Sequence, residues 1–221
     1  MTALKANSGA KPLKTGPRKP GRPRGGAINA EQREHLLDIA LHLFAQQGIA
    51  ETSLNAIARK AEVTPAMMNY YFRSREALLD IIIEERFLPL RSRIYQVFVT
   101  HADSPLLAIE HMVRELAATA QRDSWFAPLW MQEAVSESSP LRVRIQEKFG
   151  KEAREKILMI MEGWKQQGKI NSQINTVLLM SSMQSLVLVP LVQLRVGNDD
   201  ITREAIVQHA LALLCKGISA D

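Results

Sequence analysis

Side chains that commonly catalyse reactions or bind metals are few in this chain. The five histidines are scattered and match no metal-binding spacing such as His-Glu-x-x-His. They are His35, His42, His101, His111 and His209. The single cysteine, Cys215, is interpreted as a small packed residue rather than a redox sensor. The sequence also lacks a Gly-rich phosphate loop, a Gly-x-Ser-x-Gly elbow and a Cys-x-x-Cys pair, so we expect no enzyme, no metal site and no cofactor.

Positive charge is concentrated near the N-terminus. The chain has 28 Lys and Arg against 23 Asp and Glu, a net charge of +5. Residues 1–26 hold seven of the cations and no acid, which leaves the rest of the chain at −2. A basic segment of this kind favours a polyanionic partner, either a nucleic acid or an anionic membrane surface. Its prolines and its lack of large apolar residues predict a flexible arm over residues 1–27.

The composition of the 221 residues indicates an all-α protein. Apolar residues make up 46% of the chain, enough for a hydrophobic core, whereas aromatic residues make up only 5%, which disfavours a β-rich fold. A single cysteine cannot form an internal disulfide, and no secretory signal is visible at the start. We therefore expect a soluble protein of a reducing cytoplasm, with no membrane partner.

Short helices with clear start signals follow the arm. Asn29 is predicted to cap the first helix. A second helix is expected over 53–61, and Thr64 is predicted to cap a third over 65–71, with proline in its first turn. Ser74 is predicted to cap a fourth, longer helix. Three short helices of which two are joined by a tight turn are typical of a helix-turn-helix module.

The remaining two-thirds of the chain also has a helical pattern. Pro89 is predicted to kink or break the fourth helix, because proline removes one intrahelical hydrogen bond. Later helices are expected over 105–122, 140–168, 176–196 and 202–217.

The helix expected over 176–196 is apolar nearly all round. Its length suits a membrane span, but several polar side chains and Pro190 argue against one. Such a helix is instead buried on every side, so with the stripe of the last helix it predicts half of a four-helix dimer interface. A plain intramolecular core is the alternative. The residues assigned to the interface are Leu186, Val189, Ile206, Ala210 and Leu213.

The residues of the helix-turn-helix region resemble those of a known family. The segments 52–64 (TSLNAIARKAEVT) and 70–78 (YYFRSREAL) combine an Ile-Ala pair, Ala-x-Val-Thr, Tyr-Tyr-Phe and Ser-Arg-Glu-x-Leu. Over about residues 33–80 this combination resembles the TetR family of bacterial repressors. Glu62 departs from the family pattern, which usually has glycine there, and a positive φ at this turn residue would carry modest strain.

The third helix is predicted to read DNA. Its exposed face is expected in the major groove, where asparagine can pair with adenine and apolar groups can meet a thymine methyl. The expected groove-facing residues are Thr64, Pro65, Ala66, Met67, Asn69 and Tyr70. For Asn69, the alternative is an ordinary exposed polar residue. Resemblance to the family implies phosphate contacts from Thr52 or Ser53, from Tyr71 and from Arg75.

The arm carries a second resemblance. Residues 18–25 (RKPGRPRG) resemble an AT-hook, whose Gly-Arg-Pro core lies extended in an A·T-rich minor groove. Narrow A·T grooves attract arginine, so Arg22 and Arg24 are predicted to contact DNA. The alternative is a solvated, merely basic tail.

These observations predict an arm at 1–27, a helix-turn-helix domain at 28–75 and a helical regulatory domain at 76–221. The resemblance implies a cytoplasmic, nucleoid-associated bacterial repressor. It would bind a near-palindromic double-stranded DNA operator as a homodimer and be released by a small, largely apolar effector. The alternative is a constitutive architectural protein that binds A·T-rich DNA without an effector. Effector contacts are expected among residues that could equally be core: His111, Trp130, Met131, Trp164, Met180 and Met183.

Overall fold

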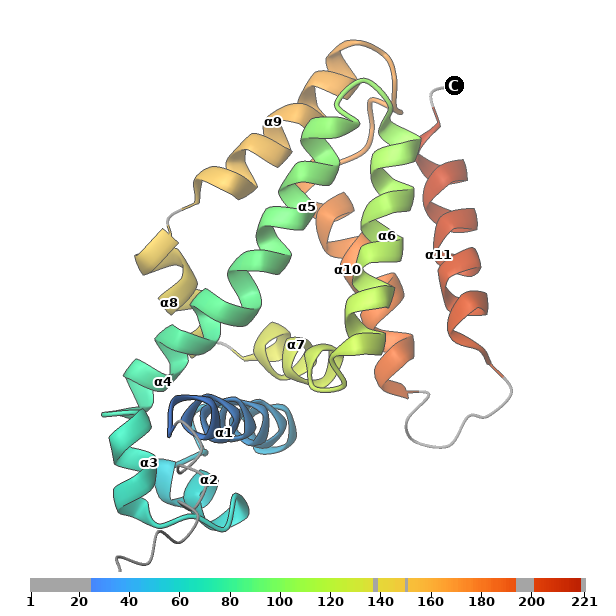
Figure 1. Cartoon of the computed structure of the whole chain (residues 1–221). Helices are drawn as coiled ribbons and strands as arrows, with labels where there is room; N and C mark the ends of the chain where they lie inside the picture. The colour runs from blue at the N-terminus through green and yellow to red at the C-terminus, as the bar shows by residue number, and fades with distance from the viewer. Residues whose placement is uncertain (1–24, 137–138, 150, 194–200, 220–221) are drawn as a thin grey trace, which may run out of the picture.

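The computed structural model describes residues 25–136, 139–149, 151–193 and 201–219, and each regular element within these ranges is a helix (Figure 1). The predicted all-α class is therefore confirmed. The predicted DNA contacts Arg22 and Arg24 lie outside the described residues.

The helices fall into a small N-terminal group and a larger C-terminal group (Figure 1). In chain order they are α1 (Gly25–Gln47), α2 (Leu54–Lys60), α3 (Pro65–Tyr71), α4 (Arg75–Ile82), the π-helical segment η1 (Ile83–Phe87), α5 (Leu88–Thr100), α6 (Pro105–Arg122), α7 (Phe126–Val135), α8 (Pro140–Phe149), α9 (Glu152–Gln166), α10 (Thr176–Gln193) and α11 (Arg203–Ile218).

Hydroxyl caps fix the starts of three helices in the N-terminal group. The side-chain oxygens of Ser53, Thr64 and Ser74 each accept a hydrogen bond from the backbone N–H three residues later, at 3.1, 3.2 and 3.1 Å. Each cap satisfies a backbone donor that the first helical turn leaves unpaired. The predicted starts of α2, α3 and α4 are therefore confirmed.

The first helix begins earlier than its sequence predicted. α1 starts at Gly25, so Asn29 lies within the helix and is not its cap. The capping signal at Asn29 is local, and the alanines on either side of it favour continuation of the helix. α1 ends at Gln47, and Gly48 follows with a φ of +88°, a conformation that glycine adopts without steric cost.

A single helical path of α4, η1 and α5 connects the two groups (Figure 1). η1 ends at Phe87, and Pro89 follows in the first turn of α5. Proline has no backbone N–H and cannot donate a hydrogen bond to the preceding turn. The wider π-helical turn before it fits this missing hydrogen bond. The predicted irregularity at Pro89 thus takes the form of a change in helix type.

One helix that the sequence predicted is divided into two in the structure. The sequence predicted a single helix from 140 to 168, but α8 ends at Phe149 and α9 begins at Glu152. Gly150, which lies outside the described residues, stands at this junction, and glycine is unfavourable inside a helix. The break lets α8 lie along α4 while α9 packs against α5 (Figure 1).

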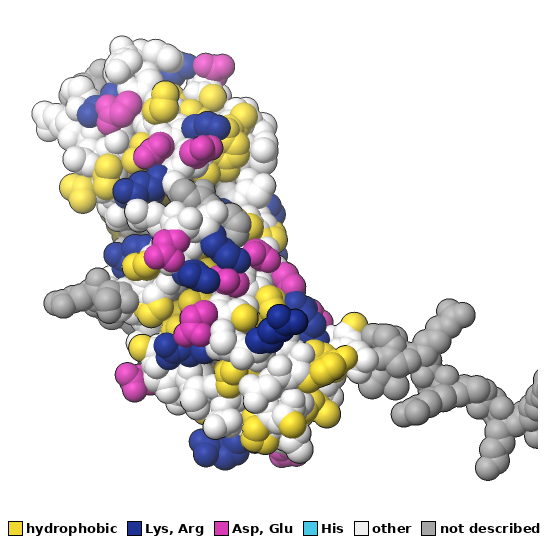
Figure 2. Space-filling model, turned by 90° about the vertical axis from the view of Figure 1, so that its left-hand side faces the viewer, with side chains coloured by type: hydrophobic (Ala, Val, Ile, Leu, Met, Phe, Trp, Pro, Cys, Tyr) yellow, Lys and Arg dark blue, Asp and Glu magenta, His cyan; other side chains and the backbone are white. Residues whose placement is uncertain are grey.

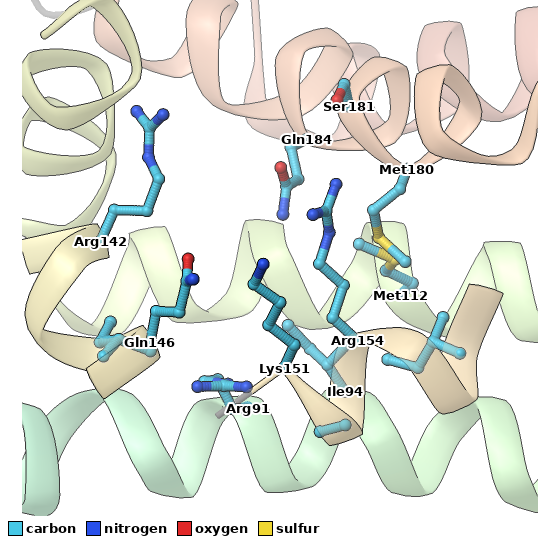
Figure 3. A pocket seen from close by; sticks show the side chains of 13 residues that line it. Arg91, Ile94, Met112, Arg142, Gln146, Lys151, Arg154, Met180, Ser181 and Gln184 are labelled. Atoms are coloured by element: carbon cyan, nitrogen blue, oxygen red, sulfur yellow. The ribbon is translucent and has the colours of Figure 1, made fainter. Parts of the chain in front are cut away.

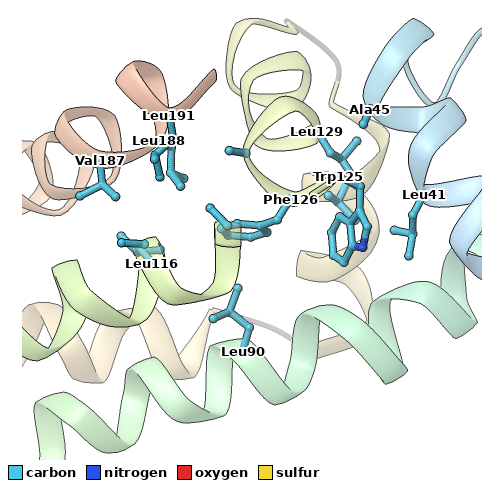
Figure 4. Close-up of a cluster of buried hydrophobic side chains, with 14 of the residues drawn as sticks. Leu41, Ala45, Leu90, Leu116, Trp125, Phe126, Leu129, Val187, Leu188 and Leu191 are labelled. Atoms are coloured by element: carbon cyan, nitrogen blue, oxygen red, sulfur yellow. The ribbon is translucent and has the colours of Figure 1, made fainter. Parts of the chain in front are cut away.

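α7 joins the two groups of helices through one continuous core. Figure 4 shows Trp125 and Leu129 directed towards Leu41 of α1, and Phe126 directed towards Leu116 of α6. All five side chains are buried. The helix-turn-helix group is therefore packed against the C-terminal group and does not hang from a linker.

α10 is, among the described residues, the one helix long and apolar enough to cross a membrane. In the fold it packs against α6, α7, α9 and α11. Met183, Val187 and Leu188 on its inner side have no exposed surface. One side of α10 therefore contributes to the intramolecular core, whereas Leu178 on the same helix is 64% exposed, so the burial on every side that the sequence predicted is not present within one chain.

Candidate nucleic-acid interface and ligand cavity

The third helix presents one face to solvent and the other to the core. Met68 and Phe72 are buried, whereas Tyr70 is 74% exposed and Met67 is 42% exposed. Thr64, Pro65, Ala66 and Asn69 are also exposed. The six residues expected to face the groove therefore share one solvated surface.

That surface is preorganised at its N-terminal end. Thr64 Oγ1 accepts the N–H of Met67 at 3.2 Å, which fixes the first turn of α3. The Asn69 carboxamide has no hydrogen-bond partner within the part of the chain that the structure describes. It is thus free to make two hydrogen bonds with a base edge.

Thr52 is not available for a phosphate contact. Its side chain is buried, and its hydroxyl donates to the Gly48 carbonyl at 2.7 Å and accepts from Gln47 Nε2 at 3.0 Å. These bonds hold the loop between α1 and α2. Of the two alternatives, the exposed Ser53 at the start of α2 is the one placed to meet a phosphate.

The other two expected phosphate contacts are held by neighbouring groups. The hydroxyl of the half-buried Tyr71 donates to Asn29 Oδ1 at 3.4 Å, which joins α3 to α1. Arg75 donates from Nη1 to the Ala50 carbonyl at 2.8 Å, so the guanidinium also ties α4 to the loop before α2. Each side chain orients the module in addition to any contact it makes with DNA.

A cavity lies in the C-terminal group, between α5, α8, α9 and α10 (Figure 3). Two adjoining spaces of about 330 and 650 Å³ share seven lining residues and form one site. Apolar side chains of α5, α6 and α7 line its far end. No three His, Cys, Asp or Glu side chains of the described residues gather into a metal-binding group.

Two of the six expected effector contacts line this cavity. Met180 and Trp130 face it from α10 and α7. Trp164 and Met183 are fully buried in the core, and the Trp164 indole N–H donates to the Ala102 carbonyl. The exposed His111 stacks on His101 with ring centroids 4.6 Å apart. Met131 does not line either space.

Sequence reasoning missed the cations of the cavity. Arg91, Arg142, Lys151 and Arg154 line it, with Gln184 and Ser181 of α10 opposite. The sequence did contain one signal of the cavity, the polar residues within the otherwise apolar α10. Polar groups in a buried apolar helix need hydrogen-bond partners, which a bound ligand can supply. The four cations themselves lie on three elements and have no common sequence pattern.

The expected interface residues divide between core and surface. Ile206 and Ala210 are buried within the chain, so they belong to the intramolecular core that was the alternative. Leu186 and Val189 are half-buried, and Leu213 is 50% exposed. An interface on α10 and α11 would therefore use Leu186, Val189 and Leu213.

The fold and the exposed α3 define a helix-turn-helix protein with a second helical domain. Residues 36–82 match the family described as bacterial regulatory proteins, tetR family. The N-terminal module is therefore similar to the modules of this family, as the sequence indicated.

Known proteins extend this likeness. The regulator AcrR of Shigella flexneri is 44% identical over 54 residues. This match covers 24% of this chain and 25% of AcrR, so it concerns a quarter of each protein. The regulator UidR of Escherichia coli is 25% identical over 84% of this chain and 92% of its own. The ketosteroid transcriptional regulator KstR2 of Mycobacterium tuberculosis superposes with a TM-score of 0.65 at 19% identity, over 86% of this chain and 96% of its own. Over 86% of its length the chain thus has the fold of KstR2.

Proposed function

We propose that this protein is a homodimeric transcriptional repressor of the bacterial cytoplasm that a small molecule releases from its operator. The observation that carries the DNA-binding part is the solvated face of α3. Two large apolar side chains, Met67 and Tyr70, stand in water beside Asn69, which has no partner among the described residues. A major-groove surface gives all three side chains partners, since it presents thymine methyl groups and base edges.

The cavity supports an effector-dependent function over an architectural one. A partly open cavity of several hundred Å³ with an apolar end and convergent polar groups has the features of a small-molecule site. A protein that only coats A·T-rich DNA has no use for such a space. KstR2, whose fold this chain shares, is a ketosteroid regulator, which sets a precedent for small-molecule control in this architecture.

α8 provides a physical connection between the cavity and the DNA-binding module. Its Arg142 and Gln146 line the cavity. On another face of α8, Arg144 binds both carboxylate oxygens of Asp80 on α4, at 2.6 and 2.9 Å. Lys148 binds Glu84 of η1 at 2.6 Å. Basic and acidic side chains are intermixed along the surface that includes these pairs (Figure 2).

A displacement of α8 by an occupant of the cavity would therefore be transmitted to α4. α4 follows α3 directly in the chain, so its orientation determines where the recognition helix lies. A dimer binds DNA well only when its two recognition helices are about 34–36 Å apart, one turn of the duplex. The effector acts by favouring a dimer that no longer has this spacing.

Selection from a pool of random duplexes by the full chain tests this function. We expect enrichment of an inverted repeat whose half-sites have centres about 10 base pairs apart. Enrichment of A·T-rich sequence without a repeat would contradict the repressor function and support the architectural one. The enriched duplex then serves to screen small molecules for release.

A further inference from the structure

Arg91 of α5 is half-buried, and one nitrogen of its guanidinium lies in the interior without a partner. Its Nη1 has almost no accessible surface and no hydrogen-bond partner. Burial lowers the pKa of this guanidinium, because desolvation disfavours the charged form. A partly desolvated cation without a counter-ion is unfavourable, so a ligand that supplies an anion to Arg91 is favoured at this position.

Three further cations surround the same space. Arg142 from α8, Lys151 from the start of α9 and Arg154 from α9 extend towards α10 (Figure 3). Neither Lys151 nor Arg154 forms an ion pair with a carboxylate among the described residues. No acidic residue lines this part of the cavity.

The nearest carboxylate in the adjoining space is already occupied. Glu133 accepts hydrogen bonds from Ser139 Oγ at 2.5 Å and from the N–H of Leu141 at 3.2 Å. Arg142 uses one nitrogen to bind the backbone carbonyl of Glu133 at 2.7 Å, not its carboxylate. Four cations, Arg91, Arg142, Lys151 and Arg154, thus face the single carboxylate of Glu133 in the joined lining, which leaves a net positive charge around Arg91.

The other end of the cavity is apolar. Leu90, Leu116, Phe126 and Trp130 line it. A molecule that spans both ends must pair an anionic group with an apolar body. A wholly apolar molecule would leave the cations desolvated and unpaired.

We propose that the ligand of this cavity is an amphipathic organic anion, with its charged group among Arg91, Arg142, Lys151 and Arg154 and its apolar body against α6 and α7. This inference names the effector class for the proposed repressor and replaces the largely apolar effector that the sequence predicted. Guanidinium groups bind carboxylates bidentately, which adds geometric selectivity for such an anion.

Chain-matched probes separate the contribution of charge from that of apolar burial. Decanoate, decanol and decylammonium are titrated into the full-length protein below their micellar concentrations, and binding is measured by calorimetry and by the shift in melting temperature. We expect decanoate to bind at least about tenfold more tightly than decanol, and decylammonium to bind most weakly. Equal affinity for decanoate and decanol would overturn the proposal.

Variants at two of the cations test the site itself. Arg91→Met should strongly reduce the preference for decanoate, because it removes the cation whose Nη1 is buried without a partner. Arg154→Gln, at an exposed position, should reduce the preference without affecting folding. Arg93→Gln is the matched control on α5, since Arg93 pairs with Glu115 at 2.6 Å and does not line the cavity.

The anion site and the repressor function can fail independently of each other. Undiminished decanoate preference in both Arg91→Met and Arg154→Gln would refute the anion site, even if the chain represses transcription. A chain that binds decanoate through Arg91 but selects no operator would refute the repressor function and leave the anion site standing.

Discussion

At the scale of single residues, Glu62 carries the clearest local strain. It lies in the turn between α2 and α3 with a φ of +55°, the one positive φ at a residue other than glycine within the described ranges. A side chain at such a φ crowds the backbone and costs about 1 kcal/mol or more. The Glu62 side chain is exposed, so nothing in the packing compensates for that cost.

Replacing Glu62 by glycine is therefore expected to stabilise the protein. Glu62→Gly should raise the free energy of unfolding by about 1 kcal/mol, because glycine adopts positive φ without crowding. Urea denaturation measures the change. Glu62→Ala removes the same charge but keeps the Cβ, so it serves as the control. Equal stability of the two variants would show that the turn is not strained.

A second prediction at this scale concerns base recognition by Asn69. Asn69→Ala should weaken binding to the selected duplex by about 1–3 kcal/mol and relax the preference at one base pair of each half-site. Fluorescence anisotropy against a panel of single-base variants measures both effects. Arg75→Ala should instead weaken binding to every duplex alike. If Asn69→Ala keeps the same sequence preference, the Asn69 side chain does not read a base.

At the scale of elements, the ion pairs between α8 and α4 form the proposed connection between the cavity and the module. Arg144 lowers the pKa of Asp80 through the two short hydrogen bonds, and Lys148 adds to the effect. An aspartate with a lowered pKa stabilises the fold above its unfolded pKa of about 3.9. That contribution is lost as the pH falls through the lowered value in the folded state.

Asp80→Asn tests this connection through its pH dependence. The variant should melt at a lower temperature than the wild type at about pH 7. The difference should shrink as the pH falls below about 4 and disappear once the pH is below the lowered pKa of folded Asp80. Asp103→Asn is the matched control, because Asp103 pairs with Lys169 at 3.1 Å but its side chain is 96% exposed. A pH-independent difference for Asp80→Asn would show that the ion pair does not stabilise the α4–α8 contact.

At the scale of the whole molecule, the outer face of α10 and α11 is the candidate dimer surface. Leu178 and Leu213 are 64% and 50% exposed on these helices, and the half-buried Leu186 and Val189 lie between solvent and core. Exposed leucines on neighbouring helices favour association with a second copy.

Light scattering should give about twice the chain mass of 24.8 kDa. Leu213→Glu should yield folded monomers, because it places a charge in the interface without entering the core. Ile206→Glu should instead unfold the protein, since Ile206 is buried within one chain. A dimeric Leu213→Glu variant would place the interface elsewhere.

The sequence by itself determined the helix-turn-helix module almost residue by residue. Caps at Ser53, Thr64 and Ser74, and the residues that favour helix or turn, act within one turn of the chain, so their effects can be read without the fold. The start of α1 is the exception: the helix begins at Gly25, four residues before Asn29, although the two glycines that open it are poor helix formers.

Only the tertiary structure decided the burial of Thr52, the division of the last helices between core and surface, and the basic cavity. Each depends on which faces of distant helices meet, and helical periodicity does not specify the neighbour. Arg91 and Arg154 are 63 residues apart in sequence, yet the break between α8 and α9 brings α9 against α5 and places both at one cavity. Their convergence on one cavity is a property of the packed molecule and not of either sequence segment.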